Sequence, residues 1–152
     1  MIKLIAIVEK NLGIAENGKI PWEFEEDRKF FREKTLNSIV IMGRKTFESI
    51  PNAPLKNRKN CVITKKNIQN DVECFRTLEE AVQKYPSCWI IGGAQLYNYA
   101  LEKNVVQYML ITHVNAEYNP DIFLNRNHLS KFSKTILKKA DNYTICEYQR
   151  LK

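Results

Sequence analysis

Short apolar runs separated by polar loops recur along the chain. The clearest cover residues 4–8, 38–42 and 89–91. A continuous apolar run of this length is typical of a strand buried on both faces of a sheet. Weaker strand patterns cover residues 61–64, 72–75, 105–114 and 142–151. The last of these is expected to pair antiparallel with its neighbour as a sheet edge.

Helical patterns lie between several of these strands, at residues 23–35, 44–50, 77–85 and 94–102. Thr77-Leu78-Glu79-Glu80 forms a capping box at the start of the third. Residues 11–19 are expected to form a long loop, since they hold two glycines and two asparagines. Strands and helices alternate through residue 114, which predicts one α/β domain over residues 1–152, with a mostly parallel sheet and helices on both faces.

The helix predicted at residues 23–35 carries a carboxylate on its apolar side. At 100° per residue, Asp27 shares a face with Phe30 and Phe31, whereas the other acids of the helix interior lie opposite. A carboxylate on a core-facing stripe is unfavourable unless a partner stabilises it. An internal arginine, a neighbouring loop or a ligand would each serve, and the helix alone does not choose among them.

Two turns that contain glycine are also candidate binding sites. Gly43 links a buried strand to a helix that opens with Arg-Lys-Thr. This arrangement fits an anion site, and equally a plain turn with exposed basic residues. Gly92-Gly93 follows another buried strand and indicates either a close backbone approach or a tight packing turn. The GxGxxG dinucleotide fingerprint is absent.

The composition of the chain limits the kinds of function that it can have. The chain has 152 residues, 44% hydrophobic and 27% charged, which is ordinary for one globular domain. A net charge of +7 indicates a lysine-rich surface or an anionic partner, either nucleic acid or a small phosphate-bearing ligand. No apolar run approaches a membrane span and residues 1–5 lack signal-peptide features, so a cytoplasmic location is expected. The 4 cysteines are scattered and only 2 histidines could join them, which predicts reduced core thiols and no metal site.

Taken in order, the motifs over about residues 1–125 resemble the dihydrofolate reductase family. They are Asn11-Leu12-Gly13-Ile14, Asn17-Gly18, Ile20-Pro21-Trp22, Asp27 with Phe31, Val40-Ile41-Met42-Gly43-Arg44 with Thr46, Ile91-Gly92-Gly93 with Tyr97, and Thr112. Each motif alone is weak, but their order and spacing together are hard to obtain by chance. The resemblance implies an eight-stranded, mainly parallel sheet with four flanking helices.

The resemblance also implies a reaction. It is the NADPH-dependent reduction of 7,8-dihydrofolate to tetrahydrofolate, by hydride transfer to C6 and protonation at N5. This reaction feeds one-carbon metabolism and thymidylate synthesis, and the family is an antifolate target. The cofactor supplies the hydride, while the protein supplies placement and electrostatics.

Site residues follow from the same resemblance. The catalytic set is Asp27, Trp22, Thr112 and Ile20, in which Asp27 would hydrogen-bond the pterin ring and Thr112 would hold Asp27 or the pterin amino group in place. The substrate-binding set is Ile5, Ala6, Asp27, Phe31, Ile50, Leu55, Arg58, Ile91, Tyr97 and Thr112, with Arg58 placed for the α-carboxylate of the glutamate tail. The cofactor-binding set is Ala6, Ile14, Gly43, Arg44, Lys45, Thr46, Thr64, Lys65, Ile91, Gly92, Gly93, Ala94, Gln95, Leu96 and Tyr97.

Further details of the site carry over in the same way. Arg44 with Thr64 and Lys65 would read the 2′-phosphate, and Gly92-Gly93 would form a cis peptide near the pyrophosphate. Residues 9–24 would form a lid over the nicotinamide, steadied by Asp121.

The chain departs from the family pattern at a few positions. Arg28 stands where an apolar residue usually follows the acid, and we expect it to point outward. Ala15 replaces a common glycine of the lid, and Phe47 replaces a tryptophan. The Thr and Pro that usually follow the acid at Asp121 are missing, which weakens the prediction for that residue.

Three other readings compete with this one. A reductase of the same fold acting on a pyrimidine intermediate of flavin synthesis is disfavoured by the trio Asp27, Trp22 and Arg58. A nucleic-acid-binding module has support only from basic residues in 56–66 and 131–139, without interleaved aromatic residues. A scaffold that binds NADPH without turnover would not need Asp27. We therefore expect an NADPH-dependent enzyme that acts as a monomer, without nucleic-acid or membrane partners.

Overall fold

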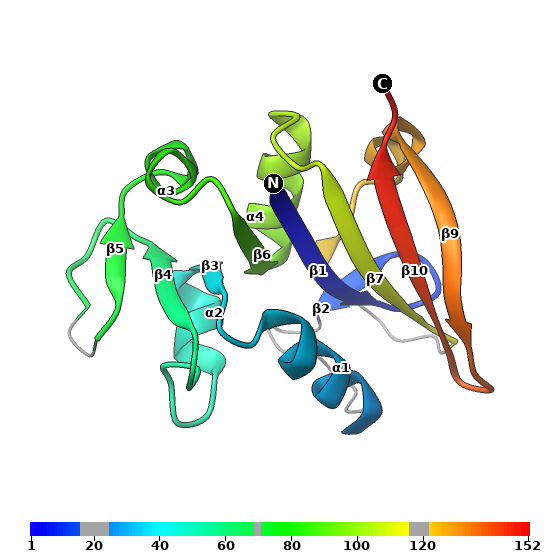
Figure 1. The fold of residues 1–152 in the computed structure, drawn as a ribbon, viewed down its shortest axis with the longest axis horizontal. Helices are drawn as coiled ribbons and strands as arrows, with labels where there is room; N and C mark the ends of the chain where they lie inside the picture. Colours follow the sequence, from blue (N-terminus) through cyan, green and yellow to red (C-terminus); the bar gives the residue numbers. More distant parts are fainter. Residues whose placement is uncertain (16–24, 69–70, 116–121) are drawn as a thin grey trace.

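A sheet of eight strands forms the frame of the protein in the computed structural model, which describes residues 1–15, 25–68, 71–115 and 122–152 (Figure 1). The strand order is β5-β4-β3-β6-β1-β7-β10-β9. The strands are β1 (Ile2–Val8), β3 (Ile39–Gly43), β4 (Lys59–Ile63), β5 (Glu73–Phe75), β6 (Cys88–Gly92), β7 (Tyr108–Val114), β9 (Phe132–Lys139) and β10 (Tyr143–Arg150). The pairs from β5 to β7 are parallel, and β10 pairs antiparallel with both β7 and β9. The mostly parallel α/β architecture predicted from the sequence is confirmed.

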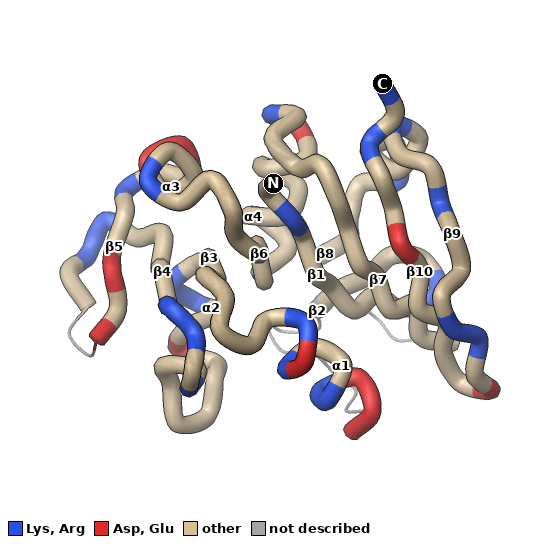
Figure 2. Tube along the Cα trace, in the orientation of Figure 1, with Lys and Arg blue, Asp and Glu red and all other residues tan. Residues whose placement is uncertain are grey.

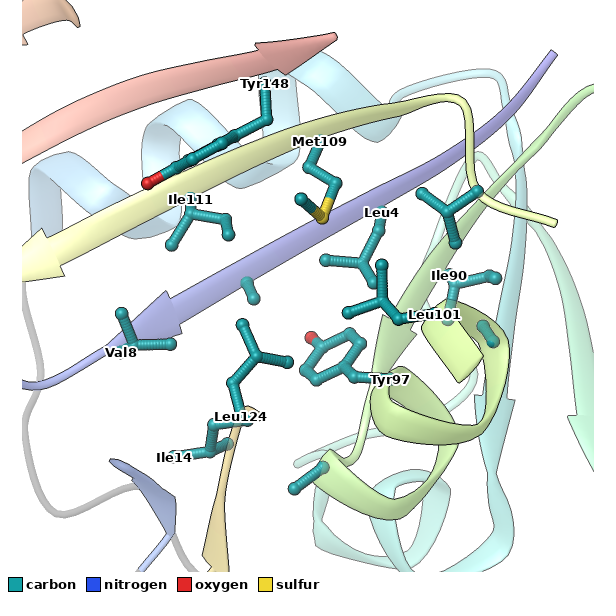
Figure 3. Packing of buried hydrophobic residues seen from close by; sticks show 14 of the residues in the cluster. Leu4, Val8, Ile14, Ile90, Tyr97, Leu101, Met109, Ile111, Leu124 and Tyr148 are labelled. Carbon is teal, nitrogen blue, oxygen red and sulfur yellow. The ribbon is translucent and has the colours of Figure 1, made fainter. Parts of the chain in front are cut away.

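Helices cover both faces of this sheet. They are α1 (Glu25–Thr35), α2 (Arg44–Ser49), α3 (Leu78–Lys84) and α4 (Ala94–Glu102). Because side chains alternate along a strand, β1 directs Leu4 and Ala6 to the face covered by α3 and α4, and Ile5 to the face covered by α1 and α2. The core is accordingly two apolar layers, and Figure 3 shows part of the layer beneath α4.

Local sequence explains where the helices begin. Thr77 caps α3, because its Oγ1 accepts a 3.2 Å hydrogen bond from the backbone N–H of Glu80, as the capping box predicts. Gly43 and Gly93 precede α2 and α4 without any side-chain cap. Residues 23 and 24 of the helix predicted at 23–35 lie outside the described residues.

The structure corrects the sequence analysis at the sheet edge. The final strand β10 pairs antiparallel as expected, but it lies one place inside, and β9 forms the edge. The sequence analysis does not predict β9 as a strand, and in the structure only Phe132 of its eight residues is buried. The loop expected at 11–19 also holds a short strand, β2 (Gly13–Ala15), which pairs with β8 (Ile122–Phe123) in a separate two-stranded sheet.

Charged residues are spread over the fold. Figure 2 shows Lys and Arg positions on β4, β9, α1 and the carboxyl terminus, with acidic positions between several of them. No described helix is both long enough and apolar enough to cross a membrane. Cys61, Cys88 and Cys146 are buried, as predicted, whereas Cys74 is half-buried. Burial raises the pKa of the Cys61 and Cys88 thiols to about 11, which disfavours the reactive thiolate.

Candidate active site

Asp27 is held by a hydroxyl group from the sheet. It lies in the first turn of α1, and Thr112 near the end of β7 donates a 2.7 Å hydrogen bond from its Oγ1 to Asp27 Oδ1. Thr112 is buried and Asp27 half-buried. Burial raises the pKa of Asp27, and the Thr112 hydrogen bond opposes that rise. Since threonine is neutral, this partner orients the carboxylate without neutralising its charge.

Tyr97 lies close to this carboxylate from the other layer. It reaches from α4 toward β1 (Figure 3), and its hydroxyl donates a 2.7 Å hydrogen bond to the backbone oxygen of Ile5. Burial raises the pKa of Tyr97, and the charge of Asp27 raises it further. The tyrosine therefore stays protonated, and it joins the two apolar layers near Asp27.

The predicted wall residues divide between those layers. Ile5, Phe31, Ile50, Leu55 and Ile91 pack in the layer covered by α1 and α2. Ala6, Ile14, Ala94, Leu96 and Tyr97 pack in the other layer. Ile5, Phe31, Ile50 and Leu55, predicted to contact the substrate alone, thus share one layer with Ile91, which is in both sets. Ala6, Ile14 and Tyr97, predicted to lie near the nicotinamide, share the second layer.

The glycine pair after β6 meets α2 closely. Gly92-Gly93 is a cis peptide, as expected, and Gly92 has a φ of 132°. A Cβ on Gly93 would lie 3.1 Å from Thr46 Oγ1, and one on Gly92 would lie 3.3 Å from the Tyr97 hydroxyl. Thr46 and Tyr97 therefore pack so closely on the pair that a side chain at either position would displace them. The pair precedes α4 as Gly43 precedes α2, so the amino-terminal turns of two helices lie close together at this point.

Basic and hydroxyl residues follow the neighbouring strands at the same edge. Arg44 comes directly after β3, and its guanidinium pairs with Glu48 at 2.6 Å. Thr64 comes directly after β4, where its Oγ1 accepts a 3.0 Å hydrogen bond from the backbone N–H of Lys66. Lys45, Lys65 and Gln95 are exposed. The sheet order thus brings residues from separate parts of the chain to one edge.

A basic cavity of about 360 Å³ adjoins the substrate layer. Arg58 lines it, donating from a terminal nitrogen to Thr35 Oγ1 at 3.1 Å and from Nε to the backbone oxygen of Lys56 at 3.0 Å. Burial lowers the pKa of Arg58, and the charge of Arg32 lowers it further. The sequence analysis named Arg58 but missed Arg32 and Lys56, which line the same cavity. In the sequence, only their positive charge could indicate a binding role, and many ordinary surface residues carry the same charge.

The remaining predicted residues are either exposed or outside the described part of the chain. Ile20, Trp22 and Asp121 lie outside the described residues. Arg28 is exposed, as expected. No three potential metal ligands (His, Cys, Asp or Glu) gather in the ranges that the structure describes.

Glu9 was not predicted, although it organises the chain after β1. Its side chain is fully buried, and Oε1 accepts hydrogen bonds from the backbone N–H groups of Asn11 at 2.6 Å and Gly13 at 2.8 Å. The turn between them includes Leu12 at a φ of 68°, which is unusual for leucine. In the sequence, Glu9 is only an acid that follows a buried strand. Many ordinary strands end in the same way, so the sequence gives no sign of its role.

Known proteins match this chain along nearly its whole length. The family model described as dihydrofolate reductase matches residues 1–150. The dihydrofolate reductase of Buchnera aphidicola subsp. Acyrthosiphon pisum is 37% identical over 147 residues, covering 92% of this chain and 88% of that protein. The bifunctional dihydrofolate reductase-thymidylate synthase of Paramecium tetraurelia is 35% identical over 155 residues, and the chain spans 97% of its own length but only 34% of that protein.

A solved structure has the same fold. Dihydrofolate reductase from Enterococcus faecalis, complexed with NADP(H) and RAB-propyl, superposes with a TM-score of 0.85 over 100% of this chain and 97% of the other, at 24% identity.

Proposed function

The chain belongs to the dihydrofolate reductase family, and from that premise we propose how its own residues carry out the reaction. It is an NADPH-dependent oxidoreductase that reduces dihydrofolate to tetrahydrofolate. NADPH supplies the hydride when bound. The protein binds, orients and polarises the substrate.

Asp27 is the residue that polarises the pterin. It lies one helical turn before Phe31, which packs in the apolar layer that holds Ile5, and Thr112 orients its carboxyl group without supplying a compensating charge. A carboxylate in this place accepts hydrogen bonds from the ring nitrogen and the exocyclic amino group of a pterin. It thereby favours protonation at N5, with water as the immediate proton donor. The Thr112–Asp27 hydrogen bond is the observation that carries this proposal.

The cofactor residues form the second half of the site. Arg44, Thr64 and Lys65 receive the 2′-phosphate, which favours NADPH over NADH. Gly43, Lys45, Thr46 and the Gly92-Gly93 pair receive the remaining phosphates, at the turns that lead into α2 and α4. Ala94, Gln95 and Leu96 follow on α4 along the same path. Ala6, Ile14 and Tyr97 border the nicotinamide, and Ile91 contacts both ligands from the other layer.

The substrate tail and the lid complete the assignment. Arg58 binds the α-carboxylate of the glutamate tail at the basic cavity, and Ile50 and Leu55 flank the benzoyl group. Ile20 and Trp22 exclude water from the hydride, by resemblance to the family alone. From the sequence we also propose a single-domain, cytoplasmic monomer without nucleic-acid or membrane partners, which light scattering on the purified protein tests in part.

The test is a steady-state assay that follows loss of NADPH absorbance with dihydrofolate, run beside NADH. We expect turnover with NADPH and at least tenfold less with NADH at equal concentration, since one charge-assisted pair is worth about 1.5–3 kcal/mol. Asp27→Asn should lower turnover at neutral pH by about a hundredfold or more. Its activity should recover in part at acid pH, where the substrate is already protonated. An Asp27→Asn variant with an unchanged rate would remove this residue from the mechanism.

A further inference from the structure

Helix α1 carries the proposed acid but has little apolar anchorage of its own. Thr35, its last residue, is the one buried residue along the helix. Phe30 and Phe31 are half-buried against the neighbouring layer. Among the described residues, the amino-terminal turn that holds Asp27 has no buried side chain of its own, so its polar contacts help to fix its place.

Two hydroxyl groups of the sheet make such contacts with adjacent acids. Thr112 on β7 bonds Asp27, and the Tyr143 hydroxyl at the start of β10 donates a hydrogen bond to Glu26 Oε2. Tyr143 pairs with Val114 and Ile145 pairs with Thr112 across the β7–β10 ladder. Tyr143 and Thr112 therefore point from the same face of the sheet toward the same helix turn.

Burial and charge favour a specific role for this second contact. Tyr143 is 6% exposed, whereas its partner Glu26 is exposed, so the hydrogen bond joins a buried side chain of the sheet to the outer side of the helix turn. Glu26 sits in the first turn of α1, where an acid also suits the helix dipole. Lys138 Nζ lies 5.7 Å from the centroid of the Tyr143 ring and packs the ring from β9. The hydroxyl is thus a rigid point of attachment for the helix.

We propose that Tyr143 is a positioning residue for the reductase reaction, because its hydrogen bond to Glu26 fixes the first turn of α1 and so sets where Asp27 meets the pterin. This inference rests on the proposed function of Asp27. It adds a residue that lies outside the substrate and cofactor sets. Without the bond, Asp27 keeps Thr112 as a partner, but the helix turn can shift and the pterin hydrogen bonds lose their alignment.

The experiment compares Tyr143→Phe with Tyr148→Phe. Both replace a buried tyrosine of β10, and both remove one hydroxyl, but Tyr148 points to the opposite face and bonds His113 at 2.8 Å. We expect Tyr143→Phe to raise KM for dihydrofolate about fivefold, the equivalent of one hydrogen bond, and to leave KM for NADPH unchanged. Tyr148→Phe should change neither constant, although it loses similar stability.

Glu26 supplies the complementary variants. Glu26→Ala should reproduce the change in KM for dihydrofolate, and combining it with Tyr143→Phe should add nothing further. Glu26→Gln should stay near the parent value, because its amide oxygen still accepts the hydrogen bond. Equal effects of Tyr143→Phe and Tyr148→Phe on KM, or additive effects of Tyr143→Phe and Glu26→Ala, would overturn the proposal.

Hydrogen exchange separates this inference from the proposed function. In the ligand-free protein, Tyr143→Phe should speed amide exchange in the first half of α1 at least threefold, and Tyr148→Phe should not. Unchanged exchange in α1 would refute the anchoring role whatever the enzyme does. Faster exchange together with no dihydrofolate turnover in the parent protein would refute only the proposed function.

Discussion

The hydroxyl of Thr112 and the carboxylate of Asp27 meet at 2.7 Å, although 85 positions separate them in the sequence. The contact joins the first turn of α1 to the end of β7 through a neutral partner. Burial and this hydrogen bond act on the pKa of Asp27 in opposite directions. The protein thus holds an acid with a raised pKa in a fixed orientation.

The first prediction concerns that balance. Thr112→Val keeps the shape of the side chain but removes the hydrogen bond that lowers the pKa of Asp27, so this pKa should rise further. Carbon-13 NMR titration of the Asp27 carboxyl in the ligand-free protein measures it. Thr144→Val on β10, whose side chain points to the other face, should leave the titration unchanged. A lower pKa in Thr112→Val would contradict the assignment.

The second prediction links Asp27 to stability. The folded protein holds the pKa of Asp27 above its ordinary 3.8, so the unfolded chain releases this proton first. The parent should therefore lose stability as pH rises from about 3.8 through the raised pKa, and Asp27→Asn should not. Urea unfolding should show nearly equal stability below about pH 3.8 and a more stable variant at pH 7. Asp141→Asn, at an exposed carboxylate, serves as the control; a variant less stable than the parent at pH 7 would refute the argument.

A third prediction tests cofactor choice. Arg44→Ala should raise KM for NADPH about tenfold or more and leave KM for NADH unchanged, because only NADPH carries the 2′-phosphate. Glu48→Ala removes the acid that pairs with Arg44 and should leave KM for NADPH equal or lower. Equal increases for both cofactors in Arg44→Ala would place the arginine elsewhere in the site.

The fourth prediction concerns the glycine pair. Gly93→Ala should lower the free energy of unfolding by about 1–3 kcal/mol, because its Cβ would lie 3.1 Å from Thr46 Oγ1. It should also weaken NADPH binding, which fluorescence titration measures. Gly43→Ala provides the matched stability control, since the nearest atom to its Cβ would be 4.0 Å away. Adding Thr46→Ala to Gly93→Ala should restore part of the lost stability, and no restoration would point to another cause.

The order of strands and helices along the chain followed from the sequence, because buried elements leave a pattern of apolar residues. β1, β3 and β6 are apolar runs between polar loops, and α4 was predicted at the residues where it lies. β9 left no such signal, since one of its residues is buried and its place depends on backbone pairing with β10. The lone carboxylate at Asp27 was visible from helical periodicity. Thr112 came from the family resemblance alone, which left open whether it holds Asp27 or the pterin, and the structure shows its hydrogen bond to Asp27.

What the sequence determined by itself was the set of elements, the family resemblance and the residues that carry it. Only the tertiary structure decided which distant residues meet. Glu26 and Tyr143 are 117 positions apart, and neither departs from what an exposed helix acid or a strand tyrosine usually does. Glu9 likewise looks like the end of a strand until its carboxylate is found buried against two backbone N–H groups. Hydrophobic periodicity is a local property of the chain, whereas a hydrogen bond between separate elements depends on how the sheet brings them together.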